Sequence, residues 1–313
     1  MYKYMVNRMI LIVPTVLIVV TLIFAALRIL PGDPAYAILG EYATPDTLRE
    51  VRQELGLDQP WHVQYYRFMW DLVRMDLGES MSTGAPVAEL IADVFGYTVE
   101  LTFASIIVGS LIGVPLGIYS ALRRNTMLDH VGRIVALTGL SLPIFYLGVL
   151  LLLVFAVKLE WFPVISAGTT DTLLDRVHNL VLPAFTIGLV QAAFLMRITR
   201  SSMLEVISQD YIRTARSKGL PQRVVAYKHA LKNALLPVVT VMGLYVGTII
   251  SGAVLTETVF TRPGIGKLLA DAVFTRDYPV VQVTLVIFSS LVILVNLLTD
   301  LTYGFLDPRI QYK

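Results

Sequence analysis

Six segments of 19 to 24 residues contain no Asp, Glu, Lys or Arg, and they constrain the fold of this chain more than any other feature. They are residues 9–27, 101–122, 134–157, 177–196, 233–256 and 278–299. A helix needs about 20 mainly apolar residues to cross the hydrocarbon core of a bilayer. Backbone groups in lipid must be hydrogen-bonded internally, and these segments are far too long for barrel strands. The sequence therefore predicts an all-α integral membrane protein with six transmembrane helices.

The composition agrees with this class. Hydrophobic residues make up 56% of the 313 residues and charged residues only 15%. The chain has no cysteine, which excludes a disulfide framework, a thiol nucleophile and a cysteine-ligated zinc site. Its four histidines are scattered, and none forms a close metal-binding spacing with a carboxylate. We therefore expect no metal site in this chain.

The first apolar segment also has features of a signal peptide. Lys3 and Arg8 precede it, and residues 35–37 resemble a cleavage site. The apolar run of 19 residues is longer than the usual signal core of about 7–15 residues. A retained first transmembrane helix is the favoured interpretation.

The distribution of basic residues predicts the orientation. Of the 25 Lys and Arg residues, 15 lie in the N-terminus, 123–133, 197–232 and 300–313. The other connecting segments, 28–100, 158–176 and 257–277, carry 18 of the 23 acidic residues. Cytoplasmic loops are enriched in Lys and Arg, so both termini are predicted to be cytoplasmic.

The longest predicted extracytoplasmic segment, residues 31–98, has helix signals of its own. Thr44 before Pro45 predicts a helix start, and Gly56 predicts its end. A second helix follows, with an apolar face, and a third is expected to start near Pro86. That apolar face consists of Val63, Tyr66, Trp70 and Val73. The segment is predicted to be ordered and helical.

Two of the apolar segments contain small residues spaced four apart. They are Gly109, Gly113 and Gly117 in the second segment, and Gly243, Gly247 and Ser251 in the fifth. This spacing lets helix backbones approach closely in lipid. It predicts tight packing within one bundle or, alternatively, that the fifth helix lines a pore or a subunit interface. Pro115, Pro143 and Pro183 predict kinks in the second, third and fourth helices.

Several kinds of chemistry are excluded by the sequence. Residues 264–267 read Gly-Ile-Gly-Lys, but Thr261 stands where a phosphate-binding loop has glycine, and no Ser or Thr follows Lys267. No charged residue lies in the middle of an apolar segment, which argues against a proton-coupled antiporter or a membrane protease. The pattern fits a conduit whose energy comes from elsewhere. Polar candidates for the path on the fifth helix are Tyr245, Thr248, Ser251 and Glu257.

A dense basic loop separates the fourth and fifth apolar segments. Residues 210–237 carry six Lys or Arg residues and one acid. A short helix is predicted up to Gly219, followed by Pro221, a second helix through 223–235 and a break at Pro237. The charge of this loop, taken alone, favours contact of its arginines with anionic lipid headgroups. The small Ala215 and the sharp stop at Gly219 favour instead a helix that fits a groove in another protein.

Residues 210–220 and 229–237 closely resemble the cytoplasmic loop of ABC importer permeases of the dipeptide/oligopeptide/nickel group. Residues 214–216, Thr-Ala-Arg, stand where the general family pattern has Glu-Ala-Ala, and the spacing to Leu-Pro is longer. Both departures are similar to those usual in the peptide group. Other stretches that resemble family signatures are 30–34, 140–145, 257–260, 263–266, 276–279 and 306–310.

The resemblance implies a MetI-like, type I permease fold with a helical extracytoplasmic insertion after the first helix. The implied parts are residues 1–30 with the first helix, the insertion 31–98, and a core 99–313 with a coupling loop at about 198–236. The implied partners are a second permease in a heterodimer, two cytoplasmic ATP-binding subunits and an extracytoplasmic solute-binding protein. ATP and Mg would be held by the ATP-binding subunits, so this chain would contain no cofactor, catalyse no reaction and bind no nucleic acid. The implied location is the cytoplasmic (inner) membrane of a prokaryote.

The resemblance also implies roles for residues in the basic loop. Tyr211, Ile212, Ala215 and Gly219 would face a cleft on the ATP-binding subunit. Arg213, Arg216 and Lys218 would pair with acids on its rim. The ordered short helices and acidic bias of segment 31–98 lead us to expect that it receives the solute-binding protein or shapes the pore mouth; the alternative is a cap that only shields helix ends. Di- or oligopeptides are the expected solutes, with glutathione, a nickel chelate or an oligosaccharide as alternatives. The rival hypothesis is a stand-alone secondary transporter or channel with six spans.

Overall fold

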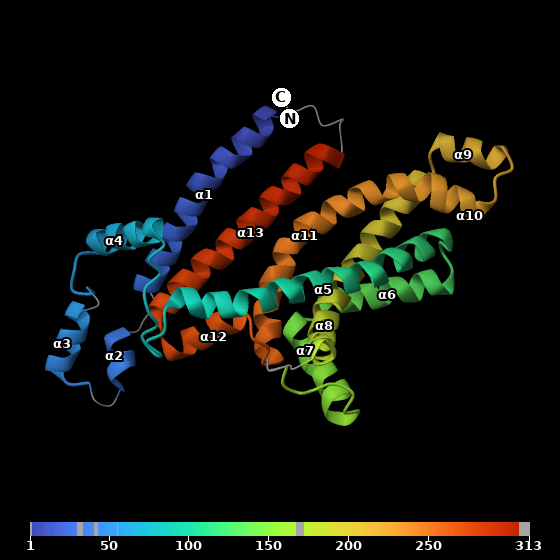
Figure 1. The fold of residues 1–313 in the computed structure, drawn as a ribbon. Coiled ribbons are helices and arrows are strands. Elements are labelled where there is room, and N and C mark those ends of the chain that lie inside the picture. The colour runs from blue at the N-terminus through green and yellow to red at the C-terminus, as the bar shows by residue number, and fades with distance from the viewer. Residues whose placement is uncertain (1, 30–33, 41–42, 55, 167–171, 307–313) are drawn as a thin grey trace.

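The computed structural model describes residues 2–29, 34–40, 43–54, 56–166 and 172–306. In this part of the chain the regular elements are helices, and five of them are each long and apolar enough to cross a membrane (Figure 1). They are α1 (Tyr2–Ile29), α5 (Val87–Leu122), α8 (Leu173–Ile207), α11 (Leu231–Val259) and α13 (Tyr278–Leu306). Each contains one of the six predicted apolar segments, so those five predictions are confirmed as helices.

The third apolar segment, 134–157, is not one straight helix. Its residues are divided between α6 (Met127–Ser141) and α7 (Ile144–Leu151), and a π-helix, η2 (Leu152–Lys158), continues α7. The two parts are bent by 106° at the break. Pro143 has no N–H to donate, and it forces the preceding Leu142 into an extended conformation with φ −83° and ψ 131°. The described residues therefore contain five spans, or six if the bent pair counts as one.

The other two predicted kinks do not interrupt their helices. Pro115 lies inside α5 and Pro183 inside α8, and both helices continue past them. Membrane helices tolerate proline because neighbouring helices and local adjustments satisfy the freed backbone groups. Proline alone therefore does not determine whether a helix of this chain is interrupted.

The small residues of α5 pack α5 against α8. A side chain at Gly113 would overlap the backbone of Ala192, and one at Gly117 would overlap Thr199 and the carbonyl of Met196. Only glycine allows this approach, so tight packing within the chain, one of the two interpretations of the spacing, is confirmed for α5.

The corresponding stripe on α11 behaves differently along its length. Gly243 faces Thr299 of α13, and Gly247 lies beside Val292 and Asn296 of the same helix. Ser251, the third member, is exposed. Gly243 and Gly247 therefore pack α11 against α13, whereas Ser251 lies on the surface of this chain.

Short helices form the segment between α1 and α5, as predicted. They are α2 (Pro34–Leu39), α3 (Pro45–Glu54) and α4 (Trp61–Arg74). The Thr44 hydroxyl accepts a hydrogen bond from the N–H of Thr47 at 3.2 Å, which caps α3 as expected. Gly56 has φ +65° after α3, a conformation that favours glycine. The helix predicted near Pro86 does begin there, but it is α5 itself, and it continues to Leu122.

The helix α4 is attached to α1 through residues other than the predicted apolar face. The ring of Phe24 contacts Tyr65 edge-on at 5.3 Å and stacks on Phe68 at 6.0 Å between centroids. Tyr65 and Thr21 also share a hydrogen bond of 2.8 Å between their hydroxyls. The predicted face, by contrast, is exposed in this chain. The prediction that α4 has an apolar face is correct, but that face does not hold α4 to the bundle.

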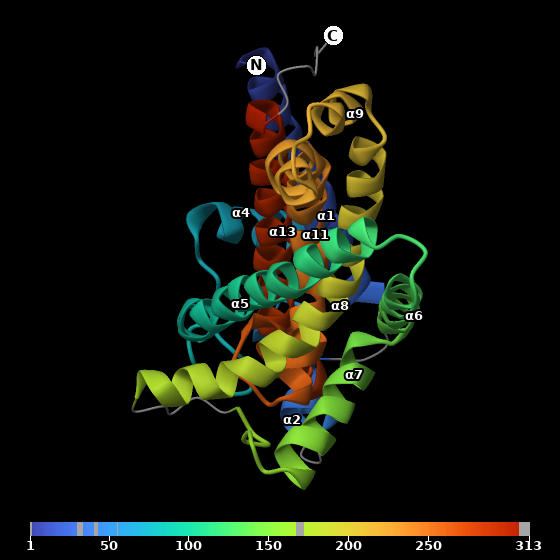
Figure 2. The same ribbon diagram turned by 90° about the vertical axis from the view of Figure 1, so that its right-hand side faces the viewer.

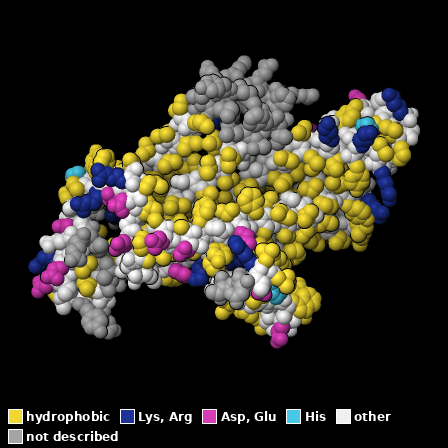
Figure 3. Space-filling view, viewed as in Figure 1, with side chains coloured by type: hydrophobic (Ala, Val, Ile, Leu, Met, Phe, Trp, Pro, Cys, Tyr) yellow, Lys and Arg dark blue, Asp and Glu magenta, His cyan; other side chains and the backbone are white. Residues whose placement is uncertain are grey.

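The two ends of the molecule differ in charge. Figure 2 places the start of α1, the end of α13 and α9 (Asp210–Ser217) at one end, and α2 and α7 at the other. Lys and Arg side chains gather at the α9 end, whereas most acidic side chains in this view lie toward α3, α4 and the start of α5 (Figure 3). An apolar surface separates the two, as expected of a protein that crosses a membrane.

Candidate functional site

The basic loop contains a short helix, α9, after a sharp turn at the end of α8. Gly219 follows α9 with φ +76°, and Pro221 directly precedes the next helix. The predicted helix and its glycine stop are therefore confirmed. The next helix begins as α10 (Gln222–Val224) and continues as a π-helix, η3 (Val225–Ala230), into α11.

The predicted break at Pro237 is wrong. Pro237 lies inside α11, and the helical stretch runs without interruption from Gln222 to Val259. Ala234 and Val238, on either side of this proline, are both completely buried. Packing on both sides holds the helix together, so the missing N–H at Pro237 does not end it.

One face of α9 packs against its own chain. Ile212 is fully buried, and Ala215 is 8% exposed. Both belong to a hydrophobic cluster with Ile118 of α5, Met203 of α8 and Ala234 of α11. The prediction that Ile212 and Ala215 face a partner is therefore not what the structure shows, because these two side chains hold α9 onto the bundle. The spacing of apolar residues correctly predicted that α9 has an apolar face, but spacing does not indicate which molecule covers that face.

The other face of α9 is exposed and basic. Tyr211, Arg213, Arg216, Lys218 and Gly219 are all exposed. The Tyr211 hydroxyl accepts a hydrogen bond of 2.8 Å from Nδ2 of Asn233, which fixes its ring against the start of α11. Arg213 contacts Asp210 at 3.6 Å in an exposed pair that contributes little stability.

Two of these cations have no acidic partner in the part of the chain that the structure describes. Neither Arg216 nor Lys218 forms an ion pair with any residue that the structure describes. The outward face of α9, defined here as Tyr211, Arg213, Arg216, Lys218 and Gly219, is thus suited to an acidic surface.

A buried ion pair lies beside this cluster and was missed in the sequence. Asp129 at the start of α6 is completely buried, and Arg200 of α8 donates to it from Nε at 2.7 Å and Nη2 at 2.8 Å. Ser120 of α5 and the N–H of Asn125 donate to the same carboxylate, at 2.5 and 3.0 Å. In the sequence, Arg200 contributes only to the count of basic residues that predicts the orientation. We call Asp129, Arg200 and Ser120 the charged clamp, since it fastens α5, α6 and α8 together.

The path candidates on α11 do not form one surface. Tyr245 stacks on Phe194 of α8 with 4.6 Å between ring centroids, and Thr248 and Ser251 are exposed. Glu257, in contrast, is fully buried. It does not line an open path in this structure, which corrects that part of the prediction.

Glu257 instead joins three helices. It accepts hydrogen bonds from the Thr98 hydroxyl of α5 at 2.6 Å and from the N–H groups of Gly266 and Lys267 at 2.8 and 3.2 Å. The two N–H groups belong to the first turn of α12 (Ile265–Thr275), where a carboxylate is favoured. A side chain at Gly264 or Gly266 would overlap the Glu257 carboxylate. The Gly-Ile-Gly-Lys stretch is therefore a cradle for Glu257, and we call these contacts the neutral cradle.

A second carboxylate fastens the segment after α4 to the start of α13. Asp277 accepts hydrogen bonds from the hydroxyls of Ser80 at 2.5 Å and Ser82 at 2.8 Å. The N–H groups of Met81 and Ser82 add two more, at 3.2 and 3.1 Å. Burial alone tends to raise the pKa of Asp277, but the hydrogen bonds from Ser80, Ser82 and Met81 together outweigh it, and the pKa is lowered. Residues 276–279 stood out in the sequence, but nothing there pointed to this role.

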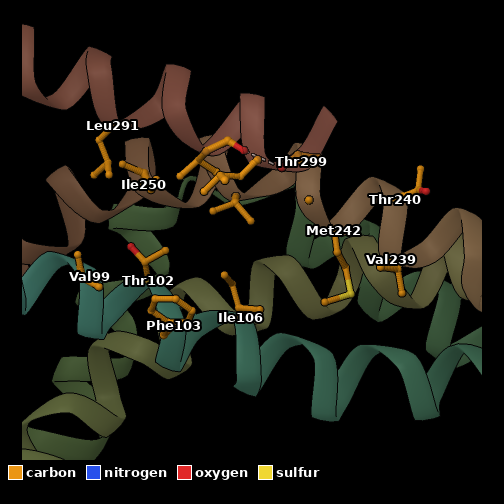
Figure 4. A pocket seen from close by; sticks show the side chains of 14 residues that line it. Val99, Thr102, Phe103, Ile106, Val239, Thr240, Met242, Ile250, Leu291 and Thr299 are labelled. Atoms are coloured by element: carbon orange, nitrogen blue, oxygen red, sulfur yellow. Dashed lines mark hydrogen bonds between the residues drawn. The ribbon is translucent and has the colours of Figure 1, made fainter. Parts of the chain in front are cut away.

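A cavity of about 430 Å³ lies between α5, α11 and α13 (Figure 4). Its lining includes Val99, Phe103, Ile106, Met242, Ile250 and Leu291. Three threonines also face it, and two of their hydroxyls, Thr102 and Thr299, are hydrogen-bonded to their own helices. The cavity is suited to apolar groups, and none of the four predicted path residues lines it. Among the described residues, no group of three or more His, Cys, Asp or Glu side chains is placed to hold a metal ion.

Comparison with known proteins agrees with these features. The model of the binding-protein-dependent transport system inner membrane component family matches residues 113–312, and the model of its N-terminal region matches residues 1–102. The chain is 40% identical over 333 residues to the dipeptide transport system permease protein DppB of Alkalihalophilus pseudofirmus, with 100% of both chains covered. It is 44% identical over 313 residues to the glutathione transport system permease protein GsiC of Salmonella paratyphi A, again over 100% of both chains.

Solved structures show the same fold. An inward-facing structure of the MetNI methionine ABC transporter matches with a TM-score of 0.58 at 19% identity, covering 71% of this chain and 98% of that one. An amino acid ABC transporter matches with a TM-score of 0.53 at 14% identity, covering 70% of this chain and 94% of that one. These likenesses show a MetI-like helical permease fold, and the sequence matches extend over the whole chain. The chain therefore belongs to the family of binding-protein-dependent transport system inner membrane components, the multi-pass permeases of ABC importers.

Proposed function

We propose that this permease imports short peptides delivered by a solute-binding protein. The support is the pair of full-length relatives whose names specify dipeptide and glutathione, since glutathione is itself a short peptide. Uptake of labelled dipeptides, glutathione, a nickel chelate and an oligosaccharide by the reconstituted transporter tests the proposal. Of these solutes, only the dipeptides and glutathione should be taken up. ATP-dependent uptake of only the chelate or the oligosaccharide would contradict the proposal.

The proposed machine contains a second, different permease and two cytoplasmic ATP-binding subunits that hold ATP and Mg. This chain would occupy the cytoplasmic membrane of a prokaryote with both termini inside. The gathering of Lys and Arg at the α9 end supports this orientation. The rival is a stand-alone channel or secondary transporter, which would carry peptide down a gradient without the other subunits. No flux is expected from this chain alone in liposomes.

The outward face of α9 is the proposed contact with the ATP-binding subunit. Its support is the division of α9 into a buried face, held by Ile212 and Ala215, and an exposed basic face on which Arg216 and Lys218 form no ion pair with a described residue. Because the buried face is continuous with α5, α8 and α11, movement of α9 would be passed directly to three spans. Rigid packing of this kind transmits displacement since packed interiors are nearly incompressible.

Charge reversal on α9 tests the coupling proposal. Arg216→Glu and Lys218→Glu should lower peptide uptake and transport-coupled ATP hydrolysis together, while the protein still inserts and folds. Arg124→Glu is the matched control, since Arg124 is an exposed arginine in the α5–α6 turn, off α9. Ala215→Arg should abolish coupled uptake by pushing α9 off the bundle. Normal uptake in both α9 charge-reversal variants would sink the proposal.

The segment 31–98 is the proposed platform for the solute-binding protein. Its support is the attachment of this segment to the core at two places, Phe24 of α1 and Asp277 before α13. Crosslinks from exposed α3 positions to the binding protein should form when the transporter is trapped facing outward. Efficient labelling without any such crosslink would contradict this role.

A further inference from the structure

A polar pocket at the end of the molecule opposite α9 has no role in the functions described so far. Its volume is about 300 Å³, and it lies between α1, the turn before α4, α4 itself and the start of α13. Four charged side chains line it: Arg28, Arg67, Asp71 and Asp76. Three amides also line it: the buried Gln282 and the half-buried Gln59 and Gln64.

Two of these amides, Gln59 and Gln282, present buried atoms without a partner among the described residues. Gln282 of α13 is only 7% exposed, and its Nε2 has no hydrogen-bond partner. Oε1 of Gln59 is likewise buried and without a partner. Buried polar atoms in folded proteins are almost always hydrogen-bonded. The pocket therefore offers one donor and one acceptor to a polar ligand.

No two of these four charged side chains form an ion pair with each other. Arg28 donates from Nε to Gln64 at 3.1 Å, and its guanidinium lies 4.5 Å from the centroid of the Phe24 ring. Among the described residues, Asp76 accepts a hydrogen bond only from the N–H of Gly78, at 3.3 Å. Arg67 and Asp71, one turn apart on α4, form no ion pair or hydrogen bond with any residue that the structure describes. Two cations and two anions that share a pocket without pairing suit a ligand that carries both signs of charge.

The surroundings of the pocket place it at the level of lipid headgroups. Arg28 lies at the end of the apolar stretch of α1, and the neighbouring Ile29 is 72% exposed. The exposed side of α4 carries Trp61, Tyr66 and Trp70. Trp and Tyr are enriched where membrane proteins pass from hydrocarbon to headgroups. Figure 3 shows basic and acidic side chains beside one another over α3 and α4, at the border of the apolar surface.

We propose that this pocket holds the headgroup of a zwitterionic phospholipid with a primary ammonium, of the phosphatidylethanolamine type. Arg28 and Arg67 bind the phosphate, and Asp71 and Asp76 bind the ammonium. Nε2 of Gln282 donates to a phosphate oxygen, and Oε1 of Gln59 accepts from the ammonium. The acyl chains follow the exposed apolar side of α1. A quaternary ammonium has no N–H to donate to Asp71, and a glycerol headgroup has no positive charge.

The test uses the whole transporter, purified and then washed with detergent. Native mass spectrometry measures which lipids remain bound, after exchange into nanodiscs of phosphatidylethanolamine, phosphatidylcholine or phosphatidylglycerol. The wild-type complex should retain phosphatidylethanolamine above the other two. Arg67→Gln and Asp71→Asn should each lower that retention roughly tenfold, because each removes a charge-assisted hydrogen bond.

Matched controls come from α3. Arg49→Gln and Asp46→Asn make the same changes of charge in the same segment, at an exposed ion pair of 3.7 Å, and should leave retention unchanged. Gln282→Leu should lower retention without lowering the melting temperature in lipid-free detergent, which separates loss of the ligand from misfolding. Equal retention of the three lipids, or equal effects of the α3 and α4 variants, would overturn the proposal. So would displacement of the lipid by a dipeptide, the other small zwitterion available to this protein.

Discussion

The two ends of α5 are both fastened by buried carboxylates, but the partners differ. At the α9 end, Ser120 of α5 donates to Asp129, whose charge is matched by Arg200. At the other end, Thr98 of α5 donates to Glu257, whose remaining partners are two backbone N–H groups. A guanidinium supplies two strong bonds at once, whereas neutral donors each supply a weaker one. The charged clamp therefore takes two of its four hydrogen bonds from one charged side chain, whereas the neutral cradle takes each of its three from a different neutral donor.

The largest effect should come from breaking the charged clamp on one side. Arg200→Met leaves the Asp129 carboxylate buried without its hydrogen-bonded cation, with only the more exposed Arg133 at 4.0 Å, and we expect a loss of about 2–3 kcal/mol in unfolding free energy. The loss should be below that of a deeply buried pair, since the Arg200 side chain is 18% exposed. Thermal unfolding of the complex in nanodiscs measures it.

A double variant sharpens this first prediction. Asp129→Leu combined with Arg200→Met removes both charges and should recover much of the loss, because no unpaired charge remains. Additive destabilisation by the two substitutions would show that the pair is not coupled, and the contrast between the two ends of α5 would then fail.

The next effect should come from the neutral cradle. Glu257→Gln keeps the size of the side chain but places an NH₂ group against N–H donors, and about 1–2 kcal/mol should be lost. Glu205→Gln, an exposed glutamate on α8, is the matched control and should change little. A loss at Glu257 larger than that at Arg200 would reverse the comparison.

The latch at Asp277 should respond to pH in a defined direction. Its pKa is lower in the folded protein than in the unfolded chain, so folding favours the ionised form. The stabilisation is complete above the unfolded-state pKa of about 4 and is lost as the pH falls through the lower, folded-state pKa. Protease protection of residues 79–86 should decrease over that acidic range in the wild type. Asp277→Asn should remove the pH dependence, and an unchanged profile would contradict the assignment.

The smallest effect should come from removing one neutral donor. Ser82→Ala deletes one hydroxyl, while Ser80 and the two N–H groups still hold Asp277, and a loss of about 0.5–1 kcal/mol is expected. Ser208→Ala serves as a control because that hydroxyl bonds only to the carbonyl of Glu205, in an exposed turn. If Ser82→Ala lost as much unfolding free energy as Arg200→Met, the remaining donors to Asp277 would not compensate for the missing hydroxyl.

Local features of the fold were predictable because they follow from short-range physics. Five of the six apolar segments, the cap at Thr44 and the stop at Gly219 each depend on neighbouring residues and were predicted correctly, whereas the third segment is divided at Pro143. Pro237 was misread because its effect depends on packing of the helix around it, which the sequence does not display. A kink was predicted at each of Pro115, Pro143 and Pro183 for the same reason. Only the helix at Pro143 is interrupted, whereas α5 and α8 continue past Pro115 and Pro183.

Contacts between distant residues could not be predicted in the same way. Asp129 and Arg200 are separated by 71 positions, and Thr98 and Glu257 by 159. Each of these side chains has an ordinary local explanation, as a loop charge, a helix hydroxyl or a polar path residue. Ile212 and Ala215 show the same limit, since their apolar spacing fitted an external groove and an internal cluster equally well.

The length of α5 gives the molecule a lever. Its 36 residues correspond to about 54 Å of continuous helix. Ile118 and Ala121 near one end belong to the cluster that holds α9, and Thr98, in the other half of the helix, contacts Glu257 and Ile265 of α12. A tilt of about 10° around its middle would carry each end about 5 Å, in opposite directions. A displacement of α5 at its α9 end would therefore also move its opposite end, because α5 is one continuous helix.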